Sequence, residues 1–173
     1  GRARALAGVS VSCGASDQRN RDSVGAVVGL SGMGSAEAET TNRALAAADA
    51  PRQARLRAIV DTRGWPGRRM VGDDAAHAAW LILQHSDSAY QRKMLPVIHA
   101  RVLVGDVRAA DEALLEDKVR MGQGRKQRFG SGLRYTTTPG AAPVLYPIEA
   151  EECVDRRRAR VLLPPPSDYL AMF

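Results

Sequence analysis

The segment from 73 to 84 constrains the fold more than any other part of this 173-residue chain. Its apolar residues recur at helical spacing and form one continuous stripe, made of Ala76, Ala79, Trp80 and Leu83. Asp73 and Asp74 precede the stripe, where negative charge favours the start of a helix. The pattern predicts a buried helix over 75–84, and a chain of this length has room for one core around it.

Other segments also show helical spacing. It predicts helices over 36–50 and 52–62, with Pro51 at the start of the second, and further helices over 88–103 and 107–121. Pro96 is expected to bend or delay the helix over 88–103. Earlier in the chain, the run Gly64-Trp65-Pro66-Gly67 ends the helix over 52–62. The Trp65 ring either pins this turn to the core or stacks on a ligand.

Beyond residue 122 the period changes from helical to alternating. Residues 127–138 and 144–148 predict a small β-hairpin, and 149–160 a charged helix that ends before three prolines. A last turn follows at 167–173. The fold class is therefore mainly α: a compact helical domain over 17–173 with a small C-terminal β-hairpin. Residues 1–16 are expected to form a flexible N-terminal extension or the remnant of a signal.

The net charge of +6 raises nucleic acid and acidic partners as possibilities. Arginine supplies 22 of the 25 basic residues and is mostly interspersed with acids, as on an ordinary solvated surface. Two clusters stand out: Arg125, Lys126, Arg128 and Arg134, and then Arg156, Arg157, Arg158 and Arg160. With only 8 aromatic residues in the chain and no recognition helix, a nucleic-acid partner is not favoured, whereas a protein partner stays open.

Apolar runs and cysteines bear on location. No apolar run approaches the roughly 20 residues that span a bilayer, so no transmembrane segment is predicted. Cys13 and Cys153 are too few for a disulfide framework and wrongly spaced for zinc. Residues 1–14 loosely match the end of a lipoprotein signal. We expect a cytoplasmic protein, with lipid anchoring or export through Cys13 as the alternative.

Five short motifs occur in a fixed order along the chain. They are Asp17-Gln18-x-x-Arg21, Gly64-Trp65-Pro66, Gln84-His85-Ser86-Asp87 with Gln91, Gly122-x-Gly124-x-x-Gln127-x-Phe129-Gly130, and Pro147-Ile148-Glu149 before Val154-Asp155-x-Arg157-Arg158. The pattern resembles an uncharacterised bacterial domain-of-unknown-function family over about 17–169. The resemblance implies a mainly helical domain with its polar residues drawn together, and no known activity. Phe129, Ser131 and Gly132 stand where that family has Tyr, Thr and Gln, which marks a lost or altered family site.

Histidine offers the most direct route to chemistry. His77 and His85 are eight residues apart, roughly 12 Å along a helix, so they cannot share a metal ion, and neither a metal nor a cofactor is predicted. His85 ends the apolar helix beside Ser86 and Asp87, where it either acts as a general acid or base or only stabilises the helix terminus. Asp87 either orients His85 or caps the next helix.

Two further patterns in the sequence bear on a functional site. A Ser-His-Asp triad is not supported, because the chain has no nucleophile elbow. The glycine-rich segment 122–132 either cradles an anion with its backbone N–H groups and Arg125 or Arg128, or forms a tight turn into the hairpin.

These residues predict a cleft for a small polar molecule. If the protein is an enzyme, His85 and Asp87 would be catalytic, in the manner of a hydrolase or lyase acting on an anionic or amide-containing substrate. The ligand-binding set is Asp17, Gln18, Arg21, Trp65, Gln84, Gln91, Arg125 and Gln127. Buried amides require partners or a ligand, which is why the glutamines belong to the set. The alternative is a non-catalytic interaction module that holds a protein or nucleic acid through the arginine clusters.

Overall fold

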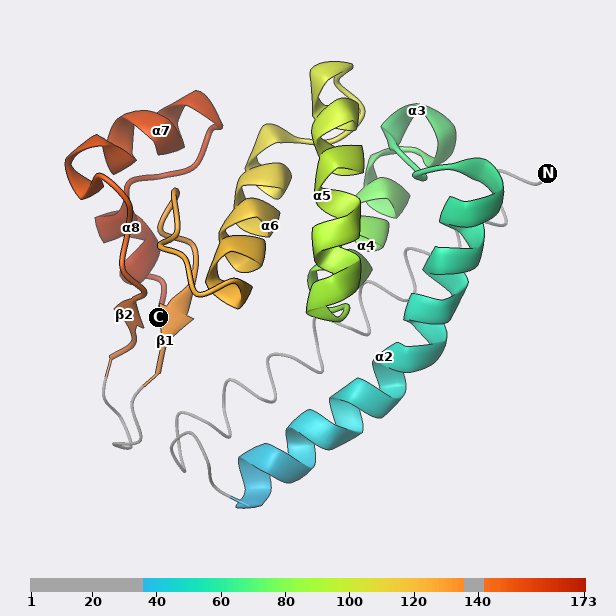
Figure 1. Ribbon diagram of the computed structural model, residues 1–173, viewed down its shortest axis with the longest axis horizontal. Helices are drawn as coiled ribbons and strands as arrows, with labels where there is room; N and C mark the ends of the chain where they lie inside the picture. The colour runs from blue at the N-terminus through green and yellow to red at the C-terminus, as the bar shows by residue number, and fades with distance from the viewer. Residues whose placement is uncertain (1–35, 136–141) are drawn as a thin grey trace.

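Helix α4 (Asp73–Gln84) lies at the centre of the helical part of the molecule. The computed structural model describes residues 36–135 and 142–173. Most of α4 is buried, including Trp80 and Leu83, and it contacts both α2 (Ala36–Arg63) and α5 (Ser88–Leu103). Helix α6 (Ala109–Gly122) packs against α5 (Figure 1). The apolar stripe of α4 therefore predicted the core correctly.

The core is built from aliphatic and aromatic side chains of these four helices and the turn after α2. Its members include Leu56, Trp65, Trp80, Leu83, Tyr90, Met94, Ile98 and Leu115. Trp65 is only 1% exposed, so its ring anchors the Gly-Trp-Pro turn in the core. This agrees with the first of the two interpretations of Trp65, anchoring of the turn, and not with stacking on a ligand. The backbone also approaches closely there: a side chain at Gly67 would overlap the carboxylate of Asp106.

Two expectations about the N-terminal half were wrong in detail. Residues 36–63 form one helix with Pro51 inside it, where two helices divided at Pro51 were predicted. A proline lacks the N–H of one helical hydrogen bond, but the following turns are held by burial of Leu56 and by the ion pair from Arg52 to Asp49, 3.1 Å. A short helix that the sequence analysis did not predict, α3 (Arg68–Val71), lies between Gly67 and Gly72.

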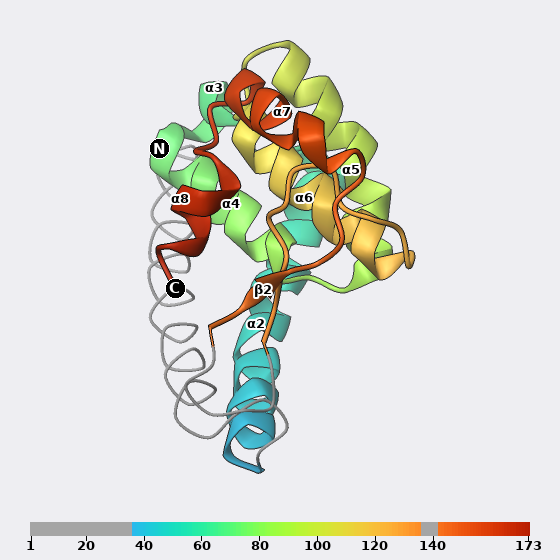
Figure 2. The same cartoon turned by 90° about the vertical axis from the view of Figure 1, so that its left-hand side faces the viewer.

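The C-terminal third lies beside α6, on the side away from α2 (Figures 1 and 2). Strand β1 (Leu133–Arg134) pairs antiparallel with β2 (Val144–Leu145), Leu133 opposite Leu145, which confirms the small sheet at a shorter length than predicted. The charged segment forms η1 (Glu151–Cys153) and α7 (Val154–Arg160). The last turn is α8 (Pro166–Leu170).

Two predictions concern location and domain bounds. Within 36–135 and 142–173, no helix is long and apolar enough to cross a membrane. The predicted extension over 1–16, with Cys13, falls outside the described residues. Cys153 carries a free, half-buried thiol.

Candidate functional site

A hollow of about 410 Å³ opens between α4, α6, the segment 131–133 and α8. Its lining consists of Trp80, Leu81, Gln84, His85, Leu114, Lys118, Met121, Ser131, Gly132, Leu133 and Tyr169. The volume lies in the range of small-molecule sites. Its walls are mostly apolar with a few polar groups, which is the usual composition of a site that binds a small molecule.

Backbone contacts fix His85 at the mouth of this hollow. His85 caps the C-terminus of α4, and its N–H donates to the carbonyls of Leu81 and Ile82. Its own carbonyl accepts a hydrogen bond of 2.8 Å from Gln53 Nε2 on α2. The imidazole is half-buried and therefore reachable from the hollow.

Lys118 lies on α6, across the hollow from α4, the helix that His85 caps. Its ammonium donates to the carbonyl of Gln84, which also accepts 2.8 Å from Gln91 Nε2 on α5. Three helices are thus joined at one carbonyl at the end of α4. Among the described residues that line the hollow, Lys118 carries the only fixed charge. An ammonium group can donate charge-assisted hydrogen bonds to a carbonyl oxygen or to an oxyanion.

Asp87 serves the next helix. Its carboxylate accepts 2.8 Å from the N–H of Tyr90, as an N-cap of α5, and pairs with Arg57 at 2.5 Å. The hydrogen bond from the Tyr90 N–H, followed by the Arg57 guanidinium, lowers the pKa of Asp87 below its usual value. Asp87 does not line the hollow, so its contacts match the capping interpretation.

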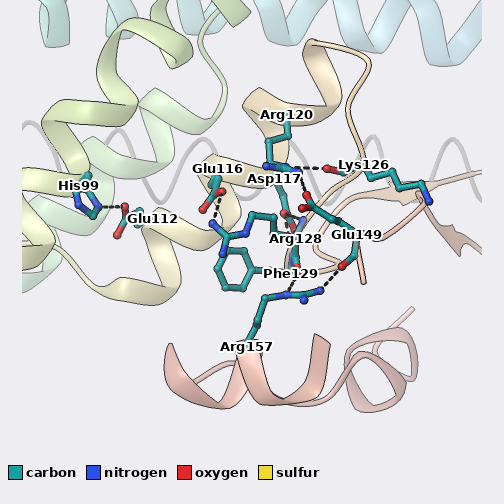
Figure 3. A network of polar contacts seen from close by, with 10 residues as sticks. All are labelled: His99, Glu112, Glu116, Asp117, Arg120, Lys126, Arg128, Phe129, Glu149 and Arg157. Carbon is teal, nitrogen blue, oxygen red and sulfur yellow. Dashed lines mark hydrogen bonds and ion pairs between the residues drawn. The ribbon is translucent and has the colours of Figure 1, made fainter. Parts of the chain in front are cut away.

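The glycine-rich loop does cradle an anion, but the anion belongs to the protein. The carboxylate of Asp117, which is 0% exposed, accepts the N–H groups of Arg128, Phe129 and Ser131 at 2.6, 3.0 and 3.0 Å. The hydroxyl of Ser131 adds a fourth bond of 2.9 Å. Figure 3 shows Asp117 reaching this loop from α6. The backbone N–H groups of this loop therefore already bind a carboxylate of the protein itself.

The other side of the same loop is held by the C-terminal segment. Arg158, 1% exposed, donates through Nη1 to the carbonyls of Phe129 and Gly130 at 2.6 and 3.2 Å. Its Nε donates to the carbonyl of Pro164. Burial lowers the pKa of Arg158, and the nearby Tyr169 and Asp117 oppose that change. Two buried opposite charges therefore hold the loop from its two faces.

Gln127 lies behind the wall of the hollow. Its amide, 0% exposed, accepts 2.8 Å from the N–H of Gly132 and donates 2.7 Å to the carbonyl of Tyr146. At Gly132 itself, an added Cβ would come within 2.3 Å of the sulfur of Met121. The absence of a side chain at Gly132 therefore lets Met121 pack against the loop backbone, and both residues form part of the lining.

The structure brings some of the predicted residues together and separates others. Gln84 and His85 line the hollow, and Gln91 contacts it through the Gln84 carbonyl. Trp65 lies in the core, and Arg125 lines a different groove between α5 and α6. Asp17, Gln18 and Arg21 are outside the described residues.

Sequence reasoning missed Lys118 and Asp117. One signal for Lys118 was present: it interrupts the stripe Leu114, Lys118, Met121 on α6, and the chain has only three lysines. Asp117 gave no signal, because its loop partners are more than ten residues away and an aspartate inside a helix is usually exposed.

Comparisons with known proteins support the family resemblance. Residues 14–173 match the model of a family described only as being of unknown function, which confirms the resemblance over most of the chain. No curated protein and no solved structure matches. Within the part of the chain that the structure describes, no group of three or more His, Cys, Asp or Glu side chains is placed to hold a metal ion.

Proposed function

Because this chain belongs to DUF6624, a family of unknown function, we propose its function from geometry: it binds a small ligand with an anionic or amide head group in the hollow at His85. The observation that supports this most is the meeting of Lys118 from α6 and His85 from α4 over an apolar floor. The head group would face these two side chains. The rest of the ligand would contact Trp80, Leu114 and Met121.

We further propose that, if the bound molecule is turned over, His85 transfers the proton. Of the polar groups in the lining, the Ser131 hydroxyl donates to Asp117 and the Tyr169 hydroxyl donates 3.0 Å to the carbonyl of Ser131. Both hydroxyls therefore hold the loop. An imidazole titrates close to neutral pH and suits general acid–base catalysis.

The arginine clusters give less support to the alternative of an interaction module. Arg158 is buried against the loop, and Arg157 donates to the carbonyls of Arg128, Glu149 and Ala150. These side chains maintain the fold, which leaves less of the C-terminal cluster for a partner.

Binding can be tested with two probes of the same shape, 3-phenylpropionate and 3-phenylpropionamide, by ligand-observed NMR and calorimetry. The substitution Lys118→Met should weaken binding of 3-phenylpropionate about tenfold or more, because one charge-assisted contact is lost. It should weaken binding of 3-phenylpropionamide less. Lys93→Met, an exposed lysine on α5 that does not line the hollow, is the matched control.

Two outcomes would contradict binding in this hollow. If neither probe binds, or if Lys118→Met and Lys93→Met have equal effects while both variants stay folded, the hollow is not a ligand site. For any compound that the wild type converts, His85→Gln should lower the turnover rate by about 10²-fold or more while binding is retained.

A further inference from the structure

A second hollow, of about 550 Å³, lies between α5, α6 and the loop after α6. It shares no lining residue with the hollow at His85. Its floor is apolar, formed by Leu95, Pro96 and Val119, and its rim is charged. The charged residues are Arg92, His99, Glu112, Glu116, Arg120, Arg125 and Arg128. We call this hollow the α5–α6 groove.

Most charges of the α5–α6 groove are paired within the protein. Glu112 contacts His99 Nδ1 at 2.5 Å, and Glu116 accepts 3.1 Å from Arg128. Arg120 pairs with Glu149 and donates to the carbonyl of Lys126. Figure 3 shows these four contacts.

Two arginines of the groove remain. The guanidinium groups of Arg92 and Arg125 have neither a hydrogen bond nor an ion pair to any residue within 36–135 or 142–173, and both residues are exposed. The groove therefore holds two guanidinium groups that no carboxylate of the described residues pairs with.

Both arginines lie at the same end. Helix α5 begins where α6 ends, since a Cβ at Gly122 would be 3.9 Å from the Cβ of Ser88. Arg92 is one turn beyond Ser88 on α5. Arg125 follows α6, and its N–H donates 2.9 Å to the carbonyl of Arg120. Positive charge is thus gathered at one end, while Glu112 lies about three turns before Gly122, near the start of α6.

We propose that Arg92 and Arg125 form a binding site for a single oxyanion group, carboxylate or phosphoryl, on a ligand whose apolar part rests on Leu95 and Val119. The planar guanidinium presents paired N–H donors that match both oxyanions. A nucleic-acid strand fits less well, because phosphates continuing along the groove would meet Glu116 and Glu112. This site is independent of the hollow at His85.

The test uses the full ¹⁵N-labelled chain and follows the Arg Nε–Hε signals by NMR at constant ionic strength. Inorganic phosphate and acetate are titrated separately, with sodium chloride as the reference anion. Saturable shifts of the Arg92 and Arg125 signals are expected with at least one oxyanion. Arg92→Gln or Arg125→Gln should weaken that binding about tenfold, and the double variant should abolish it.

Arg55→Gln, an exposed arginine on α2, is the control and should leave binding unchanged. Saturation by phosphate alone assigns a phosphoryl group, and saturation by acetate alone a carboxylate. Shifts that rise linearly and equal those with chloride would overturn the site. So would saturation that survives in the double variant.

Discussion

At the scale of single residues, Asp117 carries the most structural information. A buried carboxylate is costly unless hydrogen bonds replace its water. Here three backbone N–H groups and one hydroxyl do so. The same four bonds fix the backbone of 128–131, and through Ser131 they fix part of the wall of the hollow at His85. One side chain on α6 therefore shapes a loop that the helix does not otherwise determine.

Replacing Asp117→Asn tests this dependence. An amide nitrogen would face backbone N–H groups that can only donate, so we expect a loss of about 2–4 kcal/mol in the free energy of unfolding. The neighbouring Glu116→Gln removes only a partly exposed ion pair to Arg128 and should cost less than about 1 kcal/mol. Urea unfolding of both variants measures the difference, and equal midpoints would show that the loop does not rely on Asp117.

At the scale of elements, the C-terminal segment depends on Arg158. Helix α7 is short and charged and buries only Val154 and Arg158, so its position relies on specific contacts more than on an apolar face. The Arg158 guanidinium joins α7 to the carbonyls of Phe129 and Gly130 and to the Pro164 carbonyl beyond the helix. A planar donor group can satisfy all three at once.

Arg158→Lys keeps the charge but loses this planar geometry. We expect it to lower the free energy of unfolding by about 2–4 kcal/mol and to speed amide exchange in 128–132. Arg160→Lys, exposed on the same helix, should change stability by less than about 0.5 kcal/mol. Identical exchange rates in the two variants would mean that apolar contacts alone hold α7 in place.

Pro51 gives a second prediction for an element. Because it lies inside α2 and is exposed, Pro51→Ala restores a helical N–H without disturbing the core, and we expect a gain of about 1 kcal/mol or more. The midpoint temperature of thermal unfolding and the helical signal in circular dichroism should both increase. A loss of stability would indicate that the proline is needed where it lies.

At the scale of the whole molecule, the sequence predicted local features better than contacts between distant segments. The bounds of α5 and the burial of α4 follow from periodicity and from Asp87 as a cap, which are local signals. The lining of the hollow does not follow from local signals, because it brings Gln84 and His85 together with three residues distant in the sequence, Lys118, Ser131 and Tyr169. Periodicity carries no information on which loop a buried aspartate reaches.

The response of stability to pH also belongs to the whole molecule. His77, stacked on Trp80 with ring centroids 5.3 Å apart, lies near Asp111 in a small space that Arg68, Asp73, Asp106 and Arg108 also line. Burial lowers the pKa of His77 and raises that of Asp111. Both groups are therefore pushed toward their neutral forms, and they act on stability with opposite signs.

For His77, the unfolded chain takes up a proton at a higher pH than the folded protein does. As the pH falls through about 6.5, protons favour unfolding, so the free energy of unfolding decreases until the lowered pKa of His77 is passed. For Asp111 the folded protein takes up the proton first. Its contribution to stability therefore increases as the pH falls through its raised pKa toward about 4.

His77→Phe keeps an aromatic ring beside Trp80 and removes this titration. We expect the decrease in the free energy of unfolding between pH 7.5 and pH 4 to become smaller than in the wild type, and Asp111→Asn to make it larger, because the opposing contribution is removed. Urea unfolding at several pH values gives both slopes. Since the two substitutions should change the slope in opposite directions, a shift in the same direction would refute the proposed linkage even if both variants are less stable overall.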